Sequence, residues 1–392
     1  MKKFYAAAIL VIMCFSIFLL CSFTVNGQQA NSWPMFHGDL AHTGYSTTTG
    51  PSSNQTLWVF SSKGMVWSSP IVANGVVYFG SLDHHVYAVN SEDGSKIWDY
   101  TAGDQVYPSP AYSNNVVYIG SDDKNFYALD AQNGSLLWKY TTGGQVQSSP
   151  IISNNIVYFG SSDHNFYALS ATSGTLLWNF TTGNSVISSP CLVNGIVYFG
   201  SYDGKFYALD AQTGKEKWVF TTGSTVESSP VFGDDTIYVG SHDNNTYALN
   251  ADTGALVWKI PTGYADCIQA SPAFVNGIVY TGDSYNGNVY ALDAKTGSIK
   301  WNYTTGSYTT TFSSKEFSGS YTIAGVYTNA VGGNVEYSGA LDNKTYALNA
   351  GTGAFIWSYQ TNGNIYSSPT IANGVVYFGS DDGNVYAVGR DP

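Results

Sequence analysis

The feature that most constrains this chain is a tryptophan that returns every 40 residues. Six tryptophans follow at this unbroken spacing, and two more continue the series after longer gaps: Trp58, Trp98, Trp138, Trp178, Trp218, Trp258, Trp301 and Trp357. A fixed period of this length is typical of repeat architectures, in which a single unit cannot bury its own apolar face. The chain is therefore expected to fold by packing similar units side by side.

Each repeat is expected to form four short β-strands. In the first complete unit, residues 68–98, Asn74-Gly75 is a hairpin turn between two apolar runs, and Asp93-Gly94 separates the last two runs. A proline opens the first run in seven of the units, which suits an innermost strand with an unpaired edge. Four antiparallel strands in about 40 residues form one blade of a β-propeller.

The number of blades follows from a Tyr-Ala pair in the third strand, which occurs eight times. The eighth unit ends before a fourth strand, whereas a strand-like segment at 57–60 precedes the first complete unit. We therefore predict an all-β, eight-bladed β-propeller of four-stranded antiparallel blades, whose last blade is closed by the N-terminal strand. The expected organisation is a lead-in segment at 28–56 followed by the propeller at 57–392.

Residues 1–27 have the pattern of an export signal. Lys2 and Lys3 precede an apolar run that ends at Phe23, and small residues at 25–27 suit cleavage after Gly27. The same run is long enough to remain as an uncleaved membrane anchor, and lipid attachment at Cys21 is a third alternative. All three place the folded chain outside the cytoplasm, as a secreted, periplasmic or cell-surface protein. Contact with a membrane is expected only through this segment.

Charge and cysteine content exclude some functions. The formal net charge is −12 and the only arginine is Arg390. Binding to nucleic acid needs a basic surface, so this class of function is excluded. Two cysteines follow the signal, Cys191 and Cys267. Their positions in the repeat do not face each other, and we expect unpaired thiols.

The sequence Ala-Leu-Asp-Ala-Gln-Thr-Gly-Lys-Glu-Lys-Trp at 208–218 resembles the tryptophan-docking motif of the pyrroloquinoline-quinone-like propeller repeats. The other repeats carry close variants, and the segment 33–39 is similar to the lead-in of such propellers. The resemblance covers nearly the whole mature chain. It implies that the eight periodic tryptophans dock between neighbouring blades. This family includes quinone-dependent alcohol dehydrogenases and an outer-membrane-assembly scaffold lipoprotein.

The resemblance favours a binding scaffold over an enzyme. Dehydrogenases of the family are longer, carry adjacent cysteines beside the quinone and hold calcium, whereas this chain has no adjacent cysteines. It also has none of the common phosphate-binding, zinc-protease or serine-hydrolase motifs. We predict an exported, non-enzymatic propeller without a cofactor, which binds a protein or cell-envelope partner. A quinone-binding redox protein and a carbohydrate-binding surface protein are the alternatives.

Polar turns between the second and third strands are weak candidates for a metal site. The histidines His84, His164 and His242 fall in blades that are not neighbours, so they cannot share an ion. Aspartate recurs in this turn in seven blades, which suggests calcium. Such recurrence favours a turn role, in which the carboxylate accepts hydrogen bonds from nearby backbone N–H groups.

Positions that differ between blades are candidates for binding. The residue three before the blade-opening proline is expected at the mouth of the central channel. The aromatic members of this set belong to blades one, two and eight, which are adjacent on a ring, and therefore form an aromatic half opposite a polar half. The rings could alternatively only plug the mouth. The set comprises Trp67, Tyr107, Gln147, Ile187, Glu227, Gln269 and Tyr366.

Two irregular blades add further candidates, because insertions collect in binding loops. Blade six gains residues near Asp266 and at Asp283 and Tyr285, on the same face as the mouth. Blade seven gains about 15 residues before its second strand, within 315–333. This insertion is expected to protrude from the opposite face.

Overall fold

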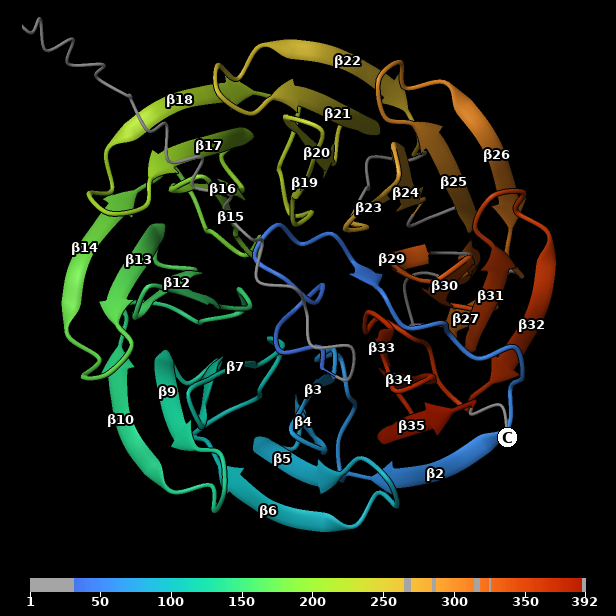
Figure 1. The fold of residues 1–392 in the computed structure, drawn as a ribbon, viewed down its shortest axis with the longest axis horizontal. Helices are drawn as coiled ribbons and strands as arrows, with labels where there is room; N and C mark the ends of the chain where they lie inside the picture. The colour runs from blue at the N-terminus through green and yellow to red at the C-terminus, as the bar shows by residue number, and fades with distance from the viewer. Residues whose placement is uncertain are drawn as a thin grey trace, which may run out of the picture.

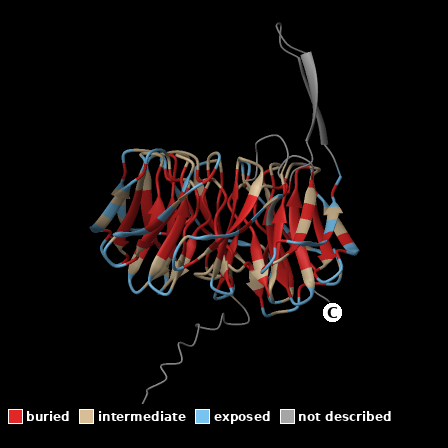
Figure 2. Ribbon diagram, turned by 90° about the horizontal axis from the view of Figure 1, so that it is seen from above, coloured by how far each residue is buried: buried red, intermediate tan, exposed pale blue. Residues whose placement is uncertain are grey.

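The computed structural model describes residues 32–263, 269–283, 287–306, 308–313, 318–323 and 326–389. They form a closed ring of eight β-blades, which follow one another round the ring in chain order (Figure 1). Seen from the side, the ring is a disc whose buried strands lie between two loop-covered faces (Figure 2). The predicted all-β, eight-bladed propeller is confirmed.

Blades one to four each contain four antiparallel strands, which follow one another from the channel outward. Blade one comprises β3 (Ile71–Ala73), β4 (Val76–Gly80), β5 (His85–Asn90) and β6 (Lys96–Thr101). Blade two comprises β7 (Ala111–Ser113), β8 (Val116–Gly120), β9 (Asn125–Asp130) and β10 (Leu136–Thr141). Blade three comprises β11 (Ile151–Ser153), β12 (Ile156–Gly160), β13 (Asn165–Ser170) and β14 (Leu176–Thr181). Blade four comprises β15 (Cys191–Val193), β16 (Ile196–Gly200), β17 (Lys205–Asp210) and β18 (Glu216–Thr221).

Blades five and six have the same plan, whereas blades seven and eight also recruit strands from the N-terminal part of the chain. Blade five comprises β19 (Val231–Gly233), β20 (Thr236–Ser241), β21 (Asn245–Asn250) and β22 (Leu256–Pro261). Blade six comprises β23 (Ala273–Val275), β24 (Ile278–Gly282), β25 (Asn288–Asp293) and β26 (Ile299–Thr304). Blade seven comprises β1 (Tyr45–Ser46), β29 (Val326–Gly332), β30 (Val335–Ala340), β31 (Lys344–Asn349) and β32 (Phe355–Gln360). Blade eight comprises β33 (Thr370–Ala372), β34 (Val375–Gly379), β35 (Asn384–Val388) and β2 (Thr56–Ser61).

Local sequence explains the form of a blade. In blade one, Asn74 and Gly75 join β3 to β4 with positive φ angles of 51° and 77°, the backbone of a tight hairpin turn that Asn-Gly favours. The next strand, β4, is buried on both sides, with Phe79 on one face and Tyr78 on the other. A continuous apolar strand of this kind is expected where neighbouring blades cover both faces of a sheet.

The ring is closed by the N-terminal strand, as predicted. Strand β2 pairs antiparallel with β35, with Trp58 opposite Ala387, and becomes the outermost strand of blade eight. The two ends of the propeller therefore meet in one sheet (Figure 1). Closure gives the last blade the same four-stranded plan as blades one to six.

Each periodic tryptophan bridges its own blade to the next one. The indole N–H of Trp98 in β6 donates to the carbonyl oxygen of Ala131 in blade two at 2.9 Å, and its ring lies against the α-carbon of Gly134. The last tryptophan of the series, Trp357, donates instead to the carbonyl oxygen of Pro51 at 3.1 Å, because the chain that precedes β2 serves this position in blade eight. The same indole-to-carbonyl bond thus joins every pair of neighbouring blades.

The insertion of blade seven lies before its first strand, and not between its first and second strands. A tight turn at Gly333-Asn334 joins β29 to β30, and the hairpin of β27 (Tyr308–Ser313) and β28 (Ser318–Ile323) lies in the connection from blade six. Successive strands alternate in direction, so all connections between blades open on the face that carries Trp67.

The prediction that this insertion protrudes from the opposite face is therefore wrong. Blade seven lacks the proline that marks the start of the first strand in the other blades. Without that marker, the sequence does not distinguish extra residues before β29 from extra residues after it.

The predicted N-terminal export signal and one cysteine lie outside the described residues. These are residues 1–27 and Cys267. Within the described ranges, no helix is long and apolar enough to cross a membrane. Cys191 in β15 is buried with a free thiol, and this burial raises its pKa above the usual range.

Candidate functional site

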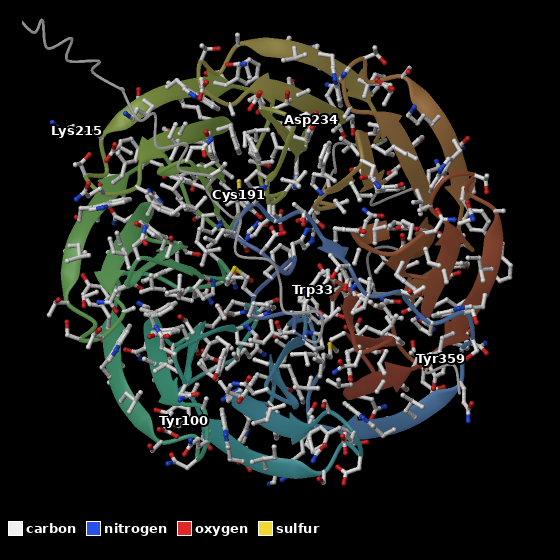
Figure 3. The ribbon with its side chains drawn as sticks, in the orientation of Figure 1. Trp33, Tyr100, Cys191, Lys215, Asp234 and Tyr359 are labelled. Atoms are coloured by element: carbon white, nitrogen blue, oxygen red, sulfur yellow. The ribbon has the colours of Figure 1, made fainter. Side chains whose placement is uncertain are left out.

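A segment that precedes the propeller closes its central channel. Residues 33–46 run across the channel and bond to the innermost strands of six blades. Trp33 exchanges two backbone hydrogen bonds with Val72 of β3, at 2.7 and 2.9 Å, and lies near the centre of the ring (Figure 3). Further along, carbonyl oxygens of this channel segment accept the backbone N–H groups of Tyr112, Leu192, Phe232, Phe274 and Val331.

These bonds satisfy polar groups that a β-propeller otherwise turns toward its channel. The N–H groups belong to the inner edges of the first strands, which have no neighbouring strand on that side. Most of the channel segment is buried, with Trp33 2% and His37 2% exposed. Burial lowers the pKa of His37 to about 4 and that of His42 well below its usual value. Both imidazoles are therefore neutral at pH 7, as a tightly packed channel requires.

Above the channel segment, a row of serine hydroxyls links all the blades except blade seven. The backbone N–H of Ser69 donates to the hydroxyl oxygen of Ser109 at 2.9 Å, and the same bond is repeated from blade to blade at 2.8–3.1 Å. These serines stand two residues after the predicted mouth positions. The row of serines therefore fixes the spacing of the side chains at the mouth. It comprises Ser69, Ser109, Ser149, Ser189, Ser229, Ser271 and Ser368.

The predicted mouth residues converge on one cavity of about 570 Å³. We call this cavity the cup. Phe36 of the channel segment also lines it, and the segment closes the channel below. All seven mouth residues contribute to its wall: Trp67, Tyr107, Gln147, Ile187, Glu227, Gln269 and Tyr366.

One half of the cup is an aromatic wall. Trp67 stacks on Tyr366 with ring centroids 4.6 Å apart, and it meets Tyr107 edge-to-face at 5.2 Å. The indole N–H of Trp67 donates to a carboxylate oxygen of Asp381 at 2.6 Å. This bond, together with the two ring contacts, holds the half-buried indole in one orientation.

The other half of the cup is polar and centred on Glu227. Its carboxylate accepts the hydroxyl of Tyr202 at 2.6 Å and the amide of Gln269 at 3.1 Å, and Nε2 of His242 lies 3.2 Å away. Burial opposes ionisation of Glu227, but these three partners outweigh it and hold its pKa below the usual range. The cup therefore contains a carboxylate that is ionised at neutral pH.

Two more carboxylates stand behind the wall. Asp122 accepts the side-chain amide of Gln147 at 3.0 Å, and Asp381 accepts the indole N–H of Trp67. Burial, assisted by the nearby charges of Asp104 and Asp123, raises the pKa of Asp122 to about 6. Burial also raises the pKa of Asp381 to about 6, assisted by the charge of Asp382. Both are mainly ionised at pH 7 and mainly protonated at pH 5.

The sequence alone did not identify the residues behind the wall of the cup, although they share one position in the repeat. Each one follows the first serine of the turn between the second and third strands, 25 residues before a mouth residue in the regular repeats. The position varies from blade to blade, as does the mouth position that it contacts. His242 occupies it in blade five and is therefore part of the polar half of the cup, and not merely a surface turn residue. The set includes Asp122, Tyr202, His242 and Asp381.

Of the three additional candidates in blade six, Asp283 is the one that the structure describes, and it does not line the cup. Asp266 and Tyr285 lie outside the described residues. Asp283 is buried, with 1% of its surface exposed, and it is not part of the cup lining. Its backbone N–H donates to the carbonyl oxygen of Asn288 at 2.8 Å, so it occupies the place of the buried turn serine of the other blades.

The recurrent aspartates have the hydrogen bonds expected of turn residues. One oxygen of Asp83 accepts the backbone N–H of His85 at 3.1 Å, and the other accepts the N–H of Lys63 at 2.9 Å and the hydroxyl of Tyr87 at 2.7 Å. Other blades repeat this pattern. Among the described residues, no group of three or more His, Cys, Asp or Glu side chains is arranged to hold a metal ion.

Comparisons with known proteins agree with the fold. The model of a protein family described as outer membrane protein assembly factor BamB matches residues 43–109, 102–192, 183–334 and 322–391. No significant match was found among curated proteins.

Several solved structures have the same architecture at low sequence identity. BamB from Moraxella catarrhalis is 20% identical with a TM-score of 0.68, over 85% of this chain and 98% of that one. The quinohemoprotein alcohol dehydrogenase of Comamonas testosteroni is 16% identical with a TM-score of 0.76, over 94% of this chain and 82% of that one. A europium-containing methanol dehydrogenase is 15% identical with a TM-score of 0.73, over 90% and 91%. At these identities the likeness concerns the fold alone.

Proposed function

The chain belongs to the family described as outer membrane protein assembly factor BamB, and from this premise we propose that it is a non-enzymatic scaffold of the cell envelope. In this role its cup-bearing face binds a partner protein. The partner is expected in the same extracytoplasmic compartment, to which an N-terminal export signal would direct the chain.

The observation that carries this proposal is the convergence of the variable residues on one rigid cavity. The side chains that repeat in the blades hold the propeller together, since the periodic tryptophans bond to neighbouring blades and the serines bond to one another. Residues that vary gather at the cup, where an aromatic wall faces an ionised carboxylate. Rigid aromatic residues around a depression are typical of the centres of protein–protein contacts, because they bury a large area at low entropic cost.

The hairpin of blade seven supports the choice of face. It leaves the disc on the same side as the cup, so the two features can act on one partner. A contact that covers both would bury more surface than one with the cup alone, as specific protein interfaces require.

A quinone cofactor does not fit the cup. Pyrroloquinoline quinone carries three carboxylate groups, and among the described residues that line the cup there is no lysine or arginine. The lining instead contains Glu227, whose pKa is held low. Glu227 already has His242 as a basic partner at 3.2 Å, and no lysine or arginine of the lining is left for a tricarboxylate. Binding of a tricarboxylate beside this carboxylate is therefore unfavourable, which supports a scaffold over a quinone-dependent dehydrogenase.

The test is capture of partners from the native envelope with three immobilised proteins. The first is the parent chain, the second carries Trp67→Ser, Tyr107→Ser and Tyr366→Ser, and the third has residues 308–323 replaced by a short turn. All three must melt at similar temperatures. We expect the parent to capture a partner that the aromatic variant loses, with a smaller loss for the hairpin variant.

Two outcomes would contradict the proposal. Equal capture by the aromatic variant would show that the cup is not the contact surface. Addition of pyrroloquinoline quinone and calcium is expected to leave no chromophore on the protein after desalting. Robust quinone-dependent oxidation of alcohols or sugars would overturn the scaffold interpretation.

A further inference from the structure

We infer that the cup recognises an organic cation, an ammonium or guanidinium group. The source of this cation rests on the proposed function: a lysine or arginine side chain of the partner protein inserts into the cup. The chemistry of the cup itself is argued from its own residues, independently of any partner.

Charge is the first argument. Glu227 stands in the wall of the cup as an ionised carboxylate. Asp122 and Asp381 stand behind the wall, in contact with Gln147 and Trp67. No described residue of the lining is a lysine or arginine, and the basic group that contacts Glu227 is the imidazole of His242, 3.2 Å away. Against these three carboxylates it supplies at most one positive charge. A carboxylate screened from bulk water attracts an opposite charge more strongly than it would at an open surface. The formal net charge of −12 also attracts cations over longer distances.

Hydrogen bonding is the second argument. Three donor groups of the wall already point at carboxylates: Trp67 at Asp381, Gln147 at Asp122, and Gln269 at Glu227. Hydrogens used in these bonds are not offered to a ligand, whereas a carboxylate oxygen can accept more than one hydrogen bond. An ammonium group has three donors, a guanidinium group has five, and neither has an acceptor. A sugar hydroxyl both donates and accepts, and would be matched less completely.

The aromatic wall and the shape of the cup are the third argument. Faces of aromatic rings attract cations, and tryptophan does so most strongly. A guanidinium group also stacks on such rings. The cavity of about 570 Å³ is closed below by Phe36 and the channel segment, so it can accept one long side chain from above while its apolar stem lies along the rings.

The inference is tested with three short peptides of equal length, acetyl-Gly-Arg-Gly-amide, acetyl-Gly-Lys-Gly-amide and the neutral acetyl-Gly-Gln-Gly-amide. Binding to the full chain is measured by saturation-transfer NMR titration, with butylammonium and maltose as further ligands. We expect saturable binding of both cationic peptides and of butylammonium, which weakens as salt is added, and no saturation with the glutamine peptide. Binding of butylammonium as tightly as the peptides would indicate that a free amine is also an adequate source of the cation.

Paired variants identify the group that responds. Glu227→Gln keeps the size of the side chain and removes its charge, and should weaken the cationic peptides about tenfold. Glu216→Gln is the same change at an exposed carboxylate of β18, far from the lining, and should leave binding unchanged. Both variants should melt close to the parent chain.

Three results would overturn the inference: no preference for the cationic peptides over the glutamine peptide, equal binding by both variants, or a tighter saturation by maltose that ignores Glu227. The envelope capture separates this failure from failure of the scaffold function. A partner that is lost by the aromatic variant but kept by Glu227→Gln would leave the scaffold standing and reject the cation. A partner that is kept by the aromatic variant would reject the cup as its contact surface, whatever the peptides do.

Discussion

The rim and the hub of this propeller both depend on tryptophan, and they use it differently. At the rim, eight tryptophans make one bond each, from the indole N–H to a backbone carbonyl of the next blade. At the hub, Trp67 bonds to the side chain of Asp381 and stacks on Tyr366. The rim partner is a backbone group present in every blade, whereas the hub partners are side chains found at one junction.

The difference teaches how a repeat protein divides its residues. A position whose partner is backbone must be the same in all blades, because the backbone is the same. A position whose partner is another variable side chain can change as long as the pair changes together. Pairs such as Gln147 with Asp122, or Glu227 with Tyr202, show this second behaviour. Substitutions at the rim are therefore expected to change stability, whereas substitutions at the hub are expected to change recognition.

The largest effect is expected from removing the one segment that serves both regions. Deletion of residues 1–62 takes away β2 from the rim and the channel segment from the hub. The loss of the buried Trp33 and Trp58 alone should lower the free energy of unfolding by more than about 5 kcal/mol. Urea denaturation against a chain that lacks only residues 1–31 provides the measurement. Equal midpoints would refute the closure of blade eight by β2.

The next effect separates a rim tryptophan from the hub tryptophan. Trp98→Ala should cost about 3–5 kcal/mol of stability, because a buried ring leaves a cavity between two blades. Trp67→Ala should cost about 1 kcal/mol, since this half-buried ring is backed by a cup open to solvent. Thermal and urea unfolding of both variants would compare them. Similar losses for the two would contradict the division of roles.

A pair of glycines compares a position at the rim with a turn of the inner strands. Gly134 and Gly195 both have positive φ, 74° and 75°, but an added Cβ at Gly134 would lie 2.7 Å from the Trp98 ring, whereas at Gly195 nothing lies within 4 Å. Gly195→Ala should cost about 1 kcal/mol for backbone strain alone. Gly134→Ala should cost about 2–3 kcal/mol, because the ring must also shift. If the two variants unfold alike in urea, close packing of glycine on the indole is not a determinant of blade docking.

The smallest effect concerns a half-buried carboxyl at the hub. The folded-state pKa of Asp381 is raised from 3.8 to about 6, so the folded chain holds this proton more tightly than the unfolded chain does. Its stabilising effect is full below pH 4 and is lost as the pH rises through 6. Asp381→Asn should therefore stabilise the protein at pH 7, by about 1 kcal/mol after allowance for solvent screening.

The same substitution should flatten the pH dependence of stability between pH 4 and 6. Urea unfolding across this range is the measurement, and Asp252→Asn in an exposed turn is the control. A steeper dependence in Asp381→Asn than in the parent chain would show that the sign is wrong. Asp122→Asn should behave in the same direction, since burial raises its pKa as well.

The sequence was sufficient for the fold because the repeat is nearly regular. Trp98 and Gly134 recur at a constant spacing, and each set identifies one structural position without knowledge of distant contacts. The same comparison of repeats brought Trp67 and Glu227 together as mouth residues, and both line the cup. In each case equivalent positions in the repeats occupy equivalent places in the blades, so a single sequence is enough to predict the place.

Other parts of the site could not be read in this way because they occur once. Phe36 belongs to a segment outside the repeats, so no internal comparison indicates that it closes the channel. Asp381 is visible only as one member of a variable position, and its contact with Trp67 joins the last blade to the first. The hairpin of blade seven was placed on the wrong face because the proline that orients the other blades is missing there.

Closure by β2 has a consequence for the order of events during synthesis. The hydroxyl of Ser61 in β2 donates to the side chain of Asn384 in β35, 323 residues later in the chain. Strand β2 therefore cannot pair until β35 has been synthesised. Until then, a nascent chain has an uncovered apolar face on blade one, and Phe79 is part of that face. Such non-local pairing is slow and leaves intermediates prone to aggregate. A stalled or shortened chain is therefore expected to remain unfinished as a whole, and not to yield a smaller working ring.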